Sequence, residues 1–228
     1  MAIRICVANL KGGVGKSVIT QNLAATLHAA KRRVMIVDTD TQRTSFRWGR
    51  EAARAKRDGP PVVEMAGDTL SRDLERIASA FEVVLIDTPA RLGEDARAAM
   101  LVADVVLMPV QPGPADVWGL HETLPVIEGA RKLRPELKAG TVLNRATRTT
   151  LTNVTREALE KLPFPLLCTM GERVAFGEAM AQGCGVADYA PGSKAAEEVQ
   201  DLVTKVLEMV GGGAKSWRSA RKTKKQQS

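Results

Sequence analysis

Residues 3–22 read IRICVANLKGGVGKSVITQN, and this stretch decides the fold. The run Ile3 to Ala8 is apolar and rich in β-branched residues, as buried strands are. The glycine-rich loop KGGVGKS at 11–17 follows it, and a helical pattern begins at Ser17. In this order, the loop N–H groups and the start of the helix can surround phosphate groups. The sequence therefore predicts a nucleotide phosphate site in residues 11–17.

The alternation of strand and helix continues along the chain. Short apolar runs predict strands at 3–8, 33–38, 83–87, 105–110 and 140–144, with weaker candidates at 62–65 and 166–169. Amphipathic segments predict helices at about 17–31, 43–55, 69–80, 94–102, 115–133, 150–161, 172–182 and 193–210. This pattern indicates an α/β fold, a single doubly wound and mostly parallel sheet with helices on both faces. We expect one domain over 1–210 and a flexible basic tail, opened by glycines, over 211–228.

The positive charge of the chain is unevenly distributed. Its 228 residues include 33 Lys plus Arg and 26 Asp plus Glu, a formal net charge of +7. Six basic residues and no acid lie in 215–228, so the first 214 residues carry only +1. A basic segment on a nearly neutral body is typical of phosphate-backbone binding, with a solubility role as the alternative. The tail residues predicted to contact DNA are Lys215, Arg218, Arg221, Lys222, Lys224 and Lys225.

Cysteine usage and hydropathy indicate a cytoplasmic protein. Cys6, Cys168 and Cys184 lack the spacing of a zinc site or a disulfide framework. The longest apolar run, Val105 to Val110, is far shorter than the ~20 residues that cross a bilayer. The N-terminal segment does not resemble a signal peptide. We therefore expect a soluble protein, and a membrane is an unlikely partner.

Carboxylates follow two of the predicted strands. VDTDTQ at 37–42 places Asp38 and Asp40 at the carboxyl end of one strand, and VVLIDTPA at 83–90 places Asp87 at the end of another. Ligands of open α/β sheets bind at that edge. Alternate residues point the same way, so Asp38 and Asp40 can both face a metal and the γ-phosphate, although Asp40 also suits a helix N-cap. Ser17 and Asp87 are predicted Mg²⁺ ligands, and Lys16 is predicted to bind the β and γ phosphates.

The loop departs from the usual GxxxxGK[ST] pattern. Leu10 stands where glycine is usual, and a second lysine, Lys11, opens the loop. With VDTDTQ, VVLIDTPA and VLNR at 142–145, this loop resembles the deviant Walker A motif of the ParA/MinD superfamily of ATPases, closest to the short-form ParA partition ATPases. PVQPGPADVWG at 109–119 and the segment 172–199 resemble further stretches of those proteins, so the resemblance covers nearly all of 1–210.

The resemblance implies roles for individual residues. Lys11 would contact the nucleotide of the other subunit of a dimer, and Asp40 would orient the attacking water. Asp38 would support Mg²⁺ through its water shell, and Asn144 would pair with adenine, a turn asparagine being the alternative. The implied nucleotide-binding residues are Lys11, Gly12, Gly13, Val14, Gly15, Lys16, Ser17, Val18 and Asn144, and the implied catalytic residues are Lys11, Lys16 and Asp40. Two positions depart from the family pattern, Val18 where relatives often have a hydroxyl and Thr41 where proline is usual.

The resemblance also implies a functional cycle. ATP and Mg²⁺ would drive a sandwich homodimer that binds nonspecific double-stranded DNA, and a ParB-like or cargo-adaptor protein would stimulate hydrolysis. Because no glutamate follows Asp87, intrinsic hydrolysis should be slow. Such a switch positions a plasmid, a chromosome or a protein cluster over the nucleoid. In the folded body, Arg156, Lys161 and Arg173 are the candidates for the DNA surface.

Two other functions share the nucleotide motifs, and one basic cluster has no assigned role. The alternatives are a MinD-like membrane-associated positioning ATPase and a dethiobiotin-synthetase-like ATP-dependent metabolic enzyme. The cluster after the second strand consists of Arg50, Arg54, Lys56 and Arg57. A solvated helix face explains it best, and a docking site for DNA or an acidic partner is the alternative.

Overall fold

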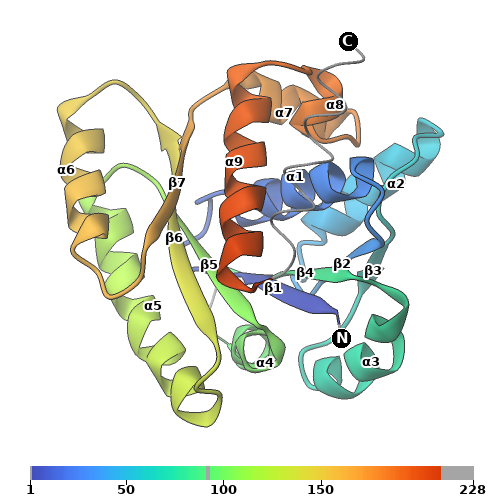
Figure 1. The fold of residues 1–228 in the computed structure, drawn as a ribbon, viewed down its shortest axis with the longest axis horizontal. Coiled ribbons are helices and arrows are strands. Elements are labelled where there is room, and N and C mark those ends of the chain that lie inside the picture. Colours follow the sequence, from blue (N-terminus) through green and yellow to red (C-terminus); the bar gives the residue numbers. More distant parts are fainter. Residues whose placement is uncertain (1, 91–92, 212–228) are drawn as a thin grey trace.

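The predicted strands form one sheet whose neighbouring strands all run parallel (Figure 1). The computed structural model describes residues 2–90 and 93–211. Its strands are β1 (Ile3–Val7), β2 (Val34–Asp38), β3 (Val62–Glu64), β4 (Val83–Asp87), β5 (Val105–Val110), β6 (Lys138–Ala146) and β7 (Leu166–Gly171). Their order across the sheet is β3-β2-β4-β1-β5-β6-β7. The predicted doubly wound sheet is confirmed, and the two weaker strand candidates are part of it.

The helices follow the predicted order, with small differences at their ends. They are α1 (Lys16–Ala29), α2 (Thr44–Arg54), α3 (Leu70–Ile77), α4 (Glu94–Val102), α5 (Pro114–Leu133), α6 (Thr150–Glu160), α7 (Val174–Ala181), α8 (Val186–Tyr189) and α9 (Lys194–Met209). The predicted helix over 69–80 is an α-helix that ends in a 3-10 turn, η1 (Ala78–Ala80). The sequence did not predict α8, because four residues are too few to show helical periodicity.

Two apolar cores lie on opposite faces of the sheet. Alternate residues of a strand face opposite ways. Ile5 and Val7 of β1 accordingly join the core beneath α1, α2 and α7–α9, whereas Cys6 and Ala8 join the core beneath α3–α6. Figure 1 shows α1 and α9 across the sheet from α3 and α4. Because both faces are covered, the functional groups of the fold are at the ends of the strands.

The strand order places the loop after β1 at the centre of the molecule. β1 is paired with β4 on one side and with β5 on the other. The chain passes from β1 to β2 on the β4 side, and later from β4 to β5 on the other side of β1. This reversal makes the carboxyl end of β1 the topological switch point where such folds bind ligands. The phosphate loop, residues 11–17, begins a few residues beyond that end of β1.

The C-terminal helix is packed against the sheet. α9 buries Val199, Leu202, Val203 and Val206, so its apolar face is not available to a membrane. No helix within residues 2–90 and 93–211 is both long enough and apolar enough to cross a bilayer. The basic tail residues, 215–228, lie outside the described residues.

Candidate functional site

The phosphate loop has the backbone conformation that its glycines permit. Gly13 and Gly15 have φ angles of 78° and 97°, a left-handed region that residues with a Cβ rarely adopt. A Cβ at Gly15 would also lie 2.2 Å from the Nδ2 atom of Asn144. α1 begins directly after Gly15, so its unpaired N–H groups are at the loop. The loop therefore has the shape and the donors that bind phosphate.

The two loop lysines have different environments. Lys16 is buried at 7% exposure, and its Nζ donates to the carbonyl oxygen of Lys11 at 3.3 Å. The side chain of Lys11 is 37% exposed and forms an ion pair with Asp116 of α5, with 2.6 Å between Nζ and Oδ2. Asp116 is itself buried. Lys11 thus lies at the rim of the site, with one of its three ammonium hydrogens bonded to Asp116.

Three carboxylates meet the loop at the carboxyl ends of β2 and β4. Asp38 and Asp87 end neighbouring strands and pair directly across the sheet. Asp40 lies two residues beyond Asp38, and its carboxylate accepts the N–H of Gln42 at 2.9 Å. The Asp38 carboxylate accepts N–H groups of Asp40 and Phe46 at 3.0 and 2.9 Å. The predicted acidic edge is therefore assembled, with each carboxylate oriented by nearby donors.

Burial dominates the electrostatics of the site. It raises the pKa of the Asp87 carboxyl to about 7, against the lowering effect of hydrogen bonds from Ser45 and Ser17. Burial also raises the pKa of Asp38 and lowers the pKa of the Lys16 ammonium, and nearby Asp87 and Asp40 oppose the latter shift. In both groups, burial disfavours the charged form. A cation beside the two carboxylates and an anion beside the Lys16 ammonium would offset that desolvation cost.

The acidic edge suits a magnesium ion that is shared with phosphate. The Oδ1 atom of Asp87 is buried and has no hydrogen-bond partner within the described part of the chain. Ser17 supplies a hydroxyl at the start of α1, and Asp38 a second carboxylate. Within residues 2–90 and 93–211, no group of three or more His, Cys, Asp or Glu forms a complete metal cage. Mg²⁺ is commonly held by one or two carboxylates plus phosphate oxygens and water, so this donor set fits it.

The far side of the loop is supported by β6 and by the segment after β5. Asn144 is 5% exposed, and its Nδ2 donates to the carbonyl oxygen of Val14 at 2.8 Å. The Nε2 of Gln111 donates to the carbonyl oxygen of Gly13 at 2.7 Å. Gln111 also lines an open hollow of about 350 Å³ beside the loop, together with Arg145. Gln111 thus connects the phosphate loop to this hollow.

Sequence reasoning missed three residues that hold the site together. They are Gln111, Asp116 and Ser45, whose Oγ donates to Asp87 Oδ2 at 2.7 Å. Gln111 and Asp116 lie in the stretch 109–119. This stretch resembles the ParA partition ATPases, but the sequence alone indicated no role for its residues. The position of Gln111 directly after β5 was the available signal, because that strand end belongs to the same edge of the sheet.

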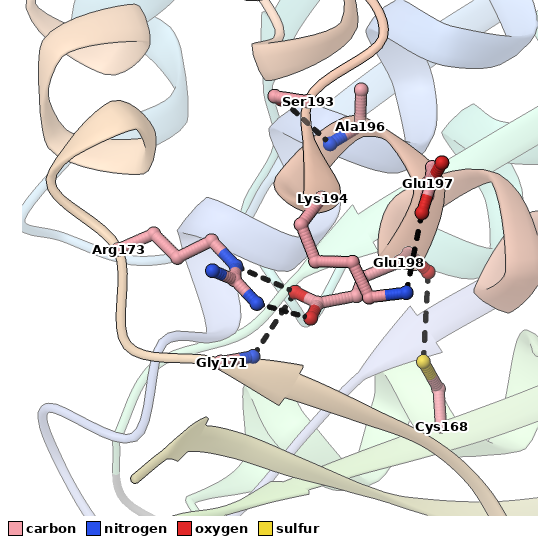
Figure 2. A network of polar contacts seen from close by, with 8 residues as sticks. All are labelled: Cys168, Gly171, Arg173, Ser193, Lys194, Ala196, Glu197 and Glu198. Carbon is pink, nitrogen blue, oxygen red and sulfur yellow. Dashed lines mark hydrogen bonds and ion pairs between the residues drawn. The ribbon is translucent and has the colours of Figure 1, made fainter.

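The three candidates for a DNA surface in the folded body lie in or beside α6 and α7. Arg173 donates to Glu198 of α9 from Nη2 at 2.7 Å and from Nε at 3.2 Å, so its charge is already paired (Figure 2). Arg156 of α6 is half-buried, and its Nε is buried without a partner in the described residues. Lys161 is exposed at the end of α6. Of the three, only Lys161 is exposed.

Comparison with known proteins identifies the family. Residues 5–186 match the model of the CobQ/CobB/MinD/ParA nucleotide-binding domain. The chain belongs to this family, and its fold and phosphate loop are those of a P-loop ATPase. A relative that spans nearly the whole chain is Maintenance of carboxysome distribution protein A of Halothiobacillus neapolitanus. It is 32% identical over 213 residues, which are 90% of this chain and 97% of the relative.

Other relatives and structures extend this result. The chromosome-partitioning ATPase Soj of Thermus thermophilus is 28% identical over 242 residues, covering 91% of this chain and 96% of Soj. The septum site-determining protein MinD of Pyrococcus horikoshii, complexed with Mg-ADP, has a TM-score of 0.74 at 21% identity, covering 92% and 98% of the two chains. Cobyrinic acid a,c-diamide synthase of Mycobacterium smegmatis, with ADP and magnesium, also has a TM-score of 0.74 at 21% identity, covering 93% and 97%. These two structures share the fold.

Proposed function

We propose that this chain is an ATP-dependent dimerising switch that positions a large cargo over the nucleoid. With ATP and Mg²⁺ it forms a homodimer, and the dimer binds nonspecific double-stranded DNA. A ParB-like or cargo-adaptor protein then stimulates a slow ATP hydrolysis and releases the DNA. The cargo is a plasmid, a chromosome or a protein cluster.

The observation that carries this proposal is the placement of Lys11. A second lysine at the exposed rim of the loop is unnecessary for phosphate binding within one subunit, because the buried Lys16 already serves that purpose. Lys11 is held by a single carboxylate and is positioned to reach outward to the nucleotide of a second subunit. The relatives named for carboxysome distribution and chromosome partitioning support a positioning role.

The residues of the site have distinct roles in this proposal. Lys16 and the loop N–H groups bind the β and γ phosphates, and Ser17, Asp38 and Asp87 would hold Mg²⁺. When bound, Mg²⁺ neutralises the charge that develops on the transferred phosphoryl group. Asp40 orients the attacking water. Thr88 follows Asp87 and donates its hydroxyl to the carbonyl oxygen of Val7 at 2.8 Å, so no strong base is adjacent. Hydrolysis is therefore slow until a partner acts.

The nucleoside is proposed to extend from the loop toward the hollow beside Gln111. Asn144 would then read the adenine with its amide oxygen, while its Nδ2 remains bonded to Val14. Arg145, the next residue, is exposed and lines the hollow. This arrangement gives one side chain two functions, shaping the loop and recognising the base.

The proposal is tested by ligand binding in three nucleotide states. Protein with ATP and Mg²⁺, with ADP and Mg²⁺, or without nucleotide is titrated against a labelled random duplex, and its mass is measured in parallel. We expect dimers and DNA binding with ATP and Mg²⁺, and neither of them in the other two states. In a parallel arm, the protein is sedimented with anionic vesicles. ATP-dependent vesicle binding without DNA binding would replace the proposal with a membrane-associated positioning ATPase, and monomers that bind neither would favour a metabolic enzyme.

The hydrolytic step is tested by Asp40→Ala, with Thr41→Ala as the neighbouring control. Asp40→Ala should retain ATP binding and lose turnover, because the phosphate-binding groups remain while the water is no longer oriented. Thr41 is exposed, and its substitution should leave turnover within about twofold. Normal turnover in Asp40→Ala would remove Asp40 from the mechanism.

A further inference from the structure

The outer face of α2 carries a stripe of arginines, which we call the α2 arginine stripe. Its members are Arg43, Arg47, Arg50 and Arg54, and all four are exposed. Their spacing of four, three and four residues places them on one side of the helix. Counted with Glu51, Lys56 and Arg57, residues 43–57 contain six basic side chains and one acid. A local charge of +5 therefore lies on a body whose net charge is +1.

The opposite face of α2 fixes the helix to the protein. Ser45, Trp48 and Ala52 are buried, and the Nε1 of Trp48 donates to the carbonyl oxygen of Cys184 at 3.2 Å. In Figure 1, α2 extends beside α1 to the periphery of the molecule. The buried face thus anchors α2 to the body and fixes the side on which the arginines are displayed. A helix whose charges only interact with solvent does not need to be anchored in this way.

The two central arginines of the stripe are unpaired. Arg43 forms an ion pair with Glu64 at 2.5 Å, and Arg54 one with Glu51 at 2.6 Å. The side chains of Arg47 and Arg50 have no hydrogen-bond or ion-pair partner in residues 2–90 and 93–211. Arg173, by contrast, is paired with Glu198. The α2 arginine stripe therefore offers uncompensated charge where the earlier candidate does not.

The chemistry of this face fits a nucleic acid better than a protein. Protein interfaces depend on buried aromatic and apolar anchors, whereas protein–DNA interfaces are polar and strongly positive. The large exposed apolar side chains of the described residues are Leu101, Trp118, Leu133, Leu151, Val154 and Val174, and none of them is on α2. Eleven residues of helix separate the ends of the stripe, a length of ~16 Å. With one phosphate per ~3.4 Å along each strand, the stripe can face about five phosphates.

The geometry points to the α2 arginine stripe as a contact surface for the phosphate backbone of duplex DNA, carried on a helix that begins at the nucleotide site. The first turn of α2 is bonded to both candidate Mg²⁺ carboxylates, through Ser45 to Asp87 at 2.7 Å and through the N–H of Phe46 to Asp38 at 2.9 Å. A change at those carboxylates therefore acts directly on the helix that holds the stripe. This inference rests on the proposed ATP-dependent DNA binding and assigns that binding a surface.

The test compares two double variants of equal charge change. Arg47→Gln with Arg50→Gln removes the unpaired charges of the stripe. Arg72→Gln with Arg76→Gln is the matched control, since both residues are exposed and one turn apart on α3, on the other side of the sheet. Each protein, with saturating ATP and Mg²⁺, is titrated against a labelled 60-base-pair random duplex at several salt concentrations. Thermal unfolding and ATP affinity of each variant are measured to confirm that the fold is retained.

We expect the stripe variant to lose tenfold or more in DNA affinity near 0.1 M salt. The slope of log K against log [salt] should become shallower by about 1 for each arginine removed per engaged subunit. Arg47→Lys with Arg50→Lys should retain most of the affinity, because the charge is kept. The α3 control should stay within about twofold, since its charges lie away from the DNA.

Three results would overturn the inference, and two of them are distinct from a failure of the proposed function. If wild-type protein binds DNA with ATP but the stripe variant binds with the same affinity and slope, the stripe is not the surface. Equal losses in the stripe and α3 variants would mean that only total charge matters. If wild-type protein does not bind duplex DNA in any nucleotide state, the proposed function fails and this inference fails with it.

Discussion

A single side chain, Asn144, connects β6 to the phosphate loop. Its Nδ2 donates to Val14, and the absence of a Cβ at Gly15 gives it room. Asn144→Ala leaves the Val14 carbonyl oxygen without its donor, a loss of about 1–3 kcal/mol for a buried group. We expect ATP and ADP affinity to fall by tenfold or more, measured by titration calorimetry.

Nucleotide selectivity separates the two proposed functions of Asn144. If its amide oxygen also reads adenine, Asn144→Ala should weaken ATP binding more than GTP binding. Equal losses for the two nucleotides would limit Asn144 to shaping the loop. Unchanged affinity for both would contradict either function. The matched control is Asn153→Ala, an exposed asparagine on α6.

Glu198 joins α9 to the end of β7. Figure 2 shows its carboxylate between the N–H of Gly171 and the guanidinium of Arg173, with distances of 3.0 Å to the former and 2.7 Å to the nearest atom of the latter. Its neighbour Glu197 is exposed, and among the described residues its carboxylate pairs with Lys194 alone, in an i,i+3 ion pair. Glu198→Gln should lower the free energy of unfolding by about 1.5–3 kcal/mol, and Glu197→Gln by less than about 0.5 kcal/mol, measured by urea denaturation. Equal effects would mean that the buried bonds contribute no more than an exposed pair.

At the scale of residues, the sequence predicts positions better than partners. Asp38 and Asp87 are predictable because a carboxylate directly after an apolar strand must emerge at the edge of a parallel sheet. The Lys11–Asp116 ion pair cannot be predicted from the sequence, because 105 residues separate the two side chains and the packing of α5 brings them together. For the same reason, Arg173 looked available from the sequence but is paired with Glu198 in the structure.

At the scale of helices and strands, the turn after α7 packs tightly against α2. Gly183 has a φ angle of 64°, and a Cβ there would lie 2.2 Å from the backbone nitrogen of Ala52. Gly183→Ala should therefore reduce the free energy of unfolding by at least about 2 kcal/mol, because left-handed strain adds to a backbone clash. The control is Gly177→Ala inside α7. Apart from the neighbouring backbone of α7 itself, no described atom lies within 4 Å of the added Cβ, and helix propensity predicts a gain of about 0.5–1 kcal/mol. Thermal and urea unfolding of both variants measure these changes, and a stable Gly183→Ala protein would show that α2 and this turn can separate freely.

The elements themselves were largely predictable, and their exact ends were not. β6 extends over Lys138–Ala146 instead of 140–144. Lys138 pairs with Val105 of β5 and Ala146 pairs with Gly171 of β7, but neither residue has the β-branched or aromatic side chain that marks a strand in the sequence. α8 is held by a contact distant in the chain, the N–H of Val186 to Asn22 Oδ1 at 2.8 Å. Local periodicity cannot indicate an element that depends on such a contact.

At the scale of the whole molecule, the positive charge is divided between two places. Six positive charges are in residues 215–228, outside the described part, and residues 43–57, which include the α2 arginine stripe, carry a net charge of +5. The rest of the body compensates for most of that local charge, since residues 1–214 total +1. DNA affinity of a dimer should therefore depend on the geometry of these two regions more than on net charge.

Removal of residues 215–228 measures the contribution of the tail. If all six basic residues contact phosphates, the slope of log K against log [salt] should become shallower by about 5 per subunit, because each contact contributes ~0.9. A full-length variant with glutamine at the six positions is the control, and it should match the truncation if charge alone is responsible. When the truncation is combined with Arg47→Gln and Arg50→Gln, the losses in binding free energy should add, since sites without shared partners behave independently. An unchanged slope after truncation would leave the folded body as the DNA-binding surface, and a combined loss smaller than the sum would mean that the tail and the stripe contact the same phosphates.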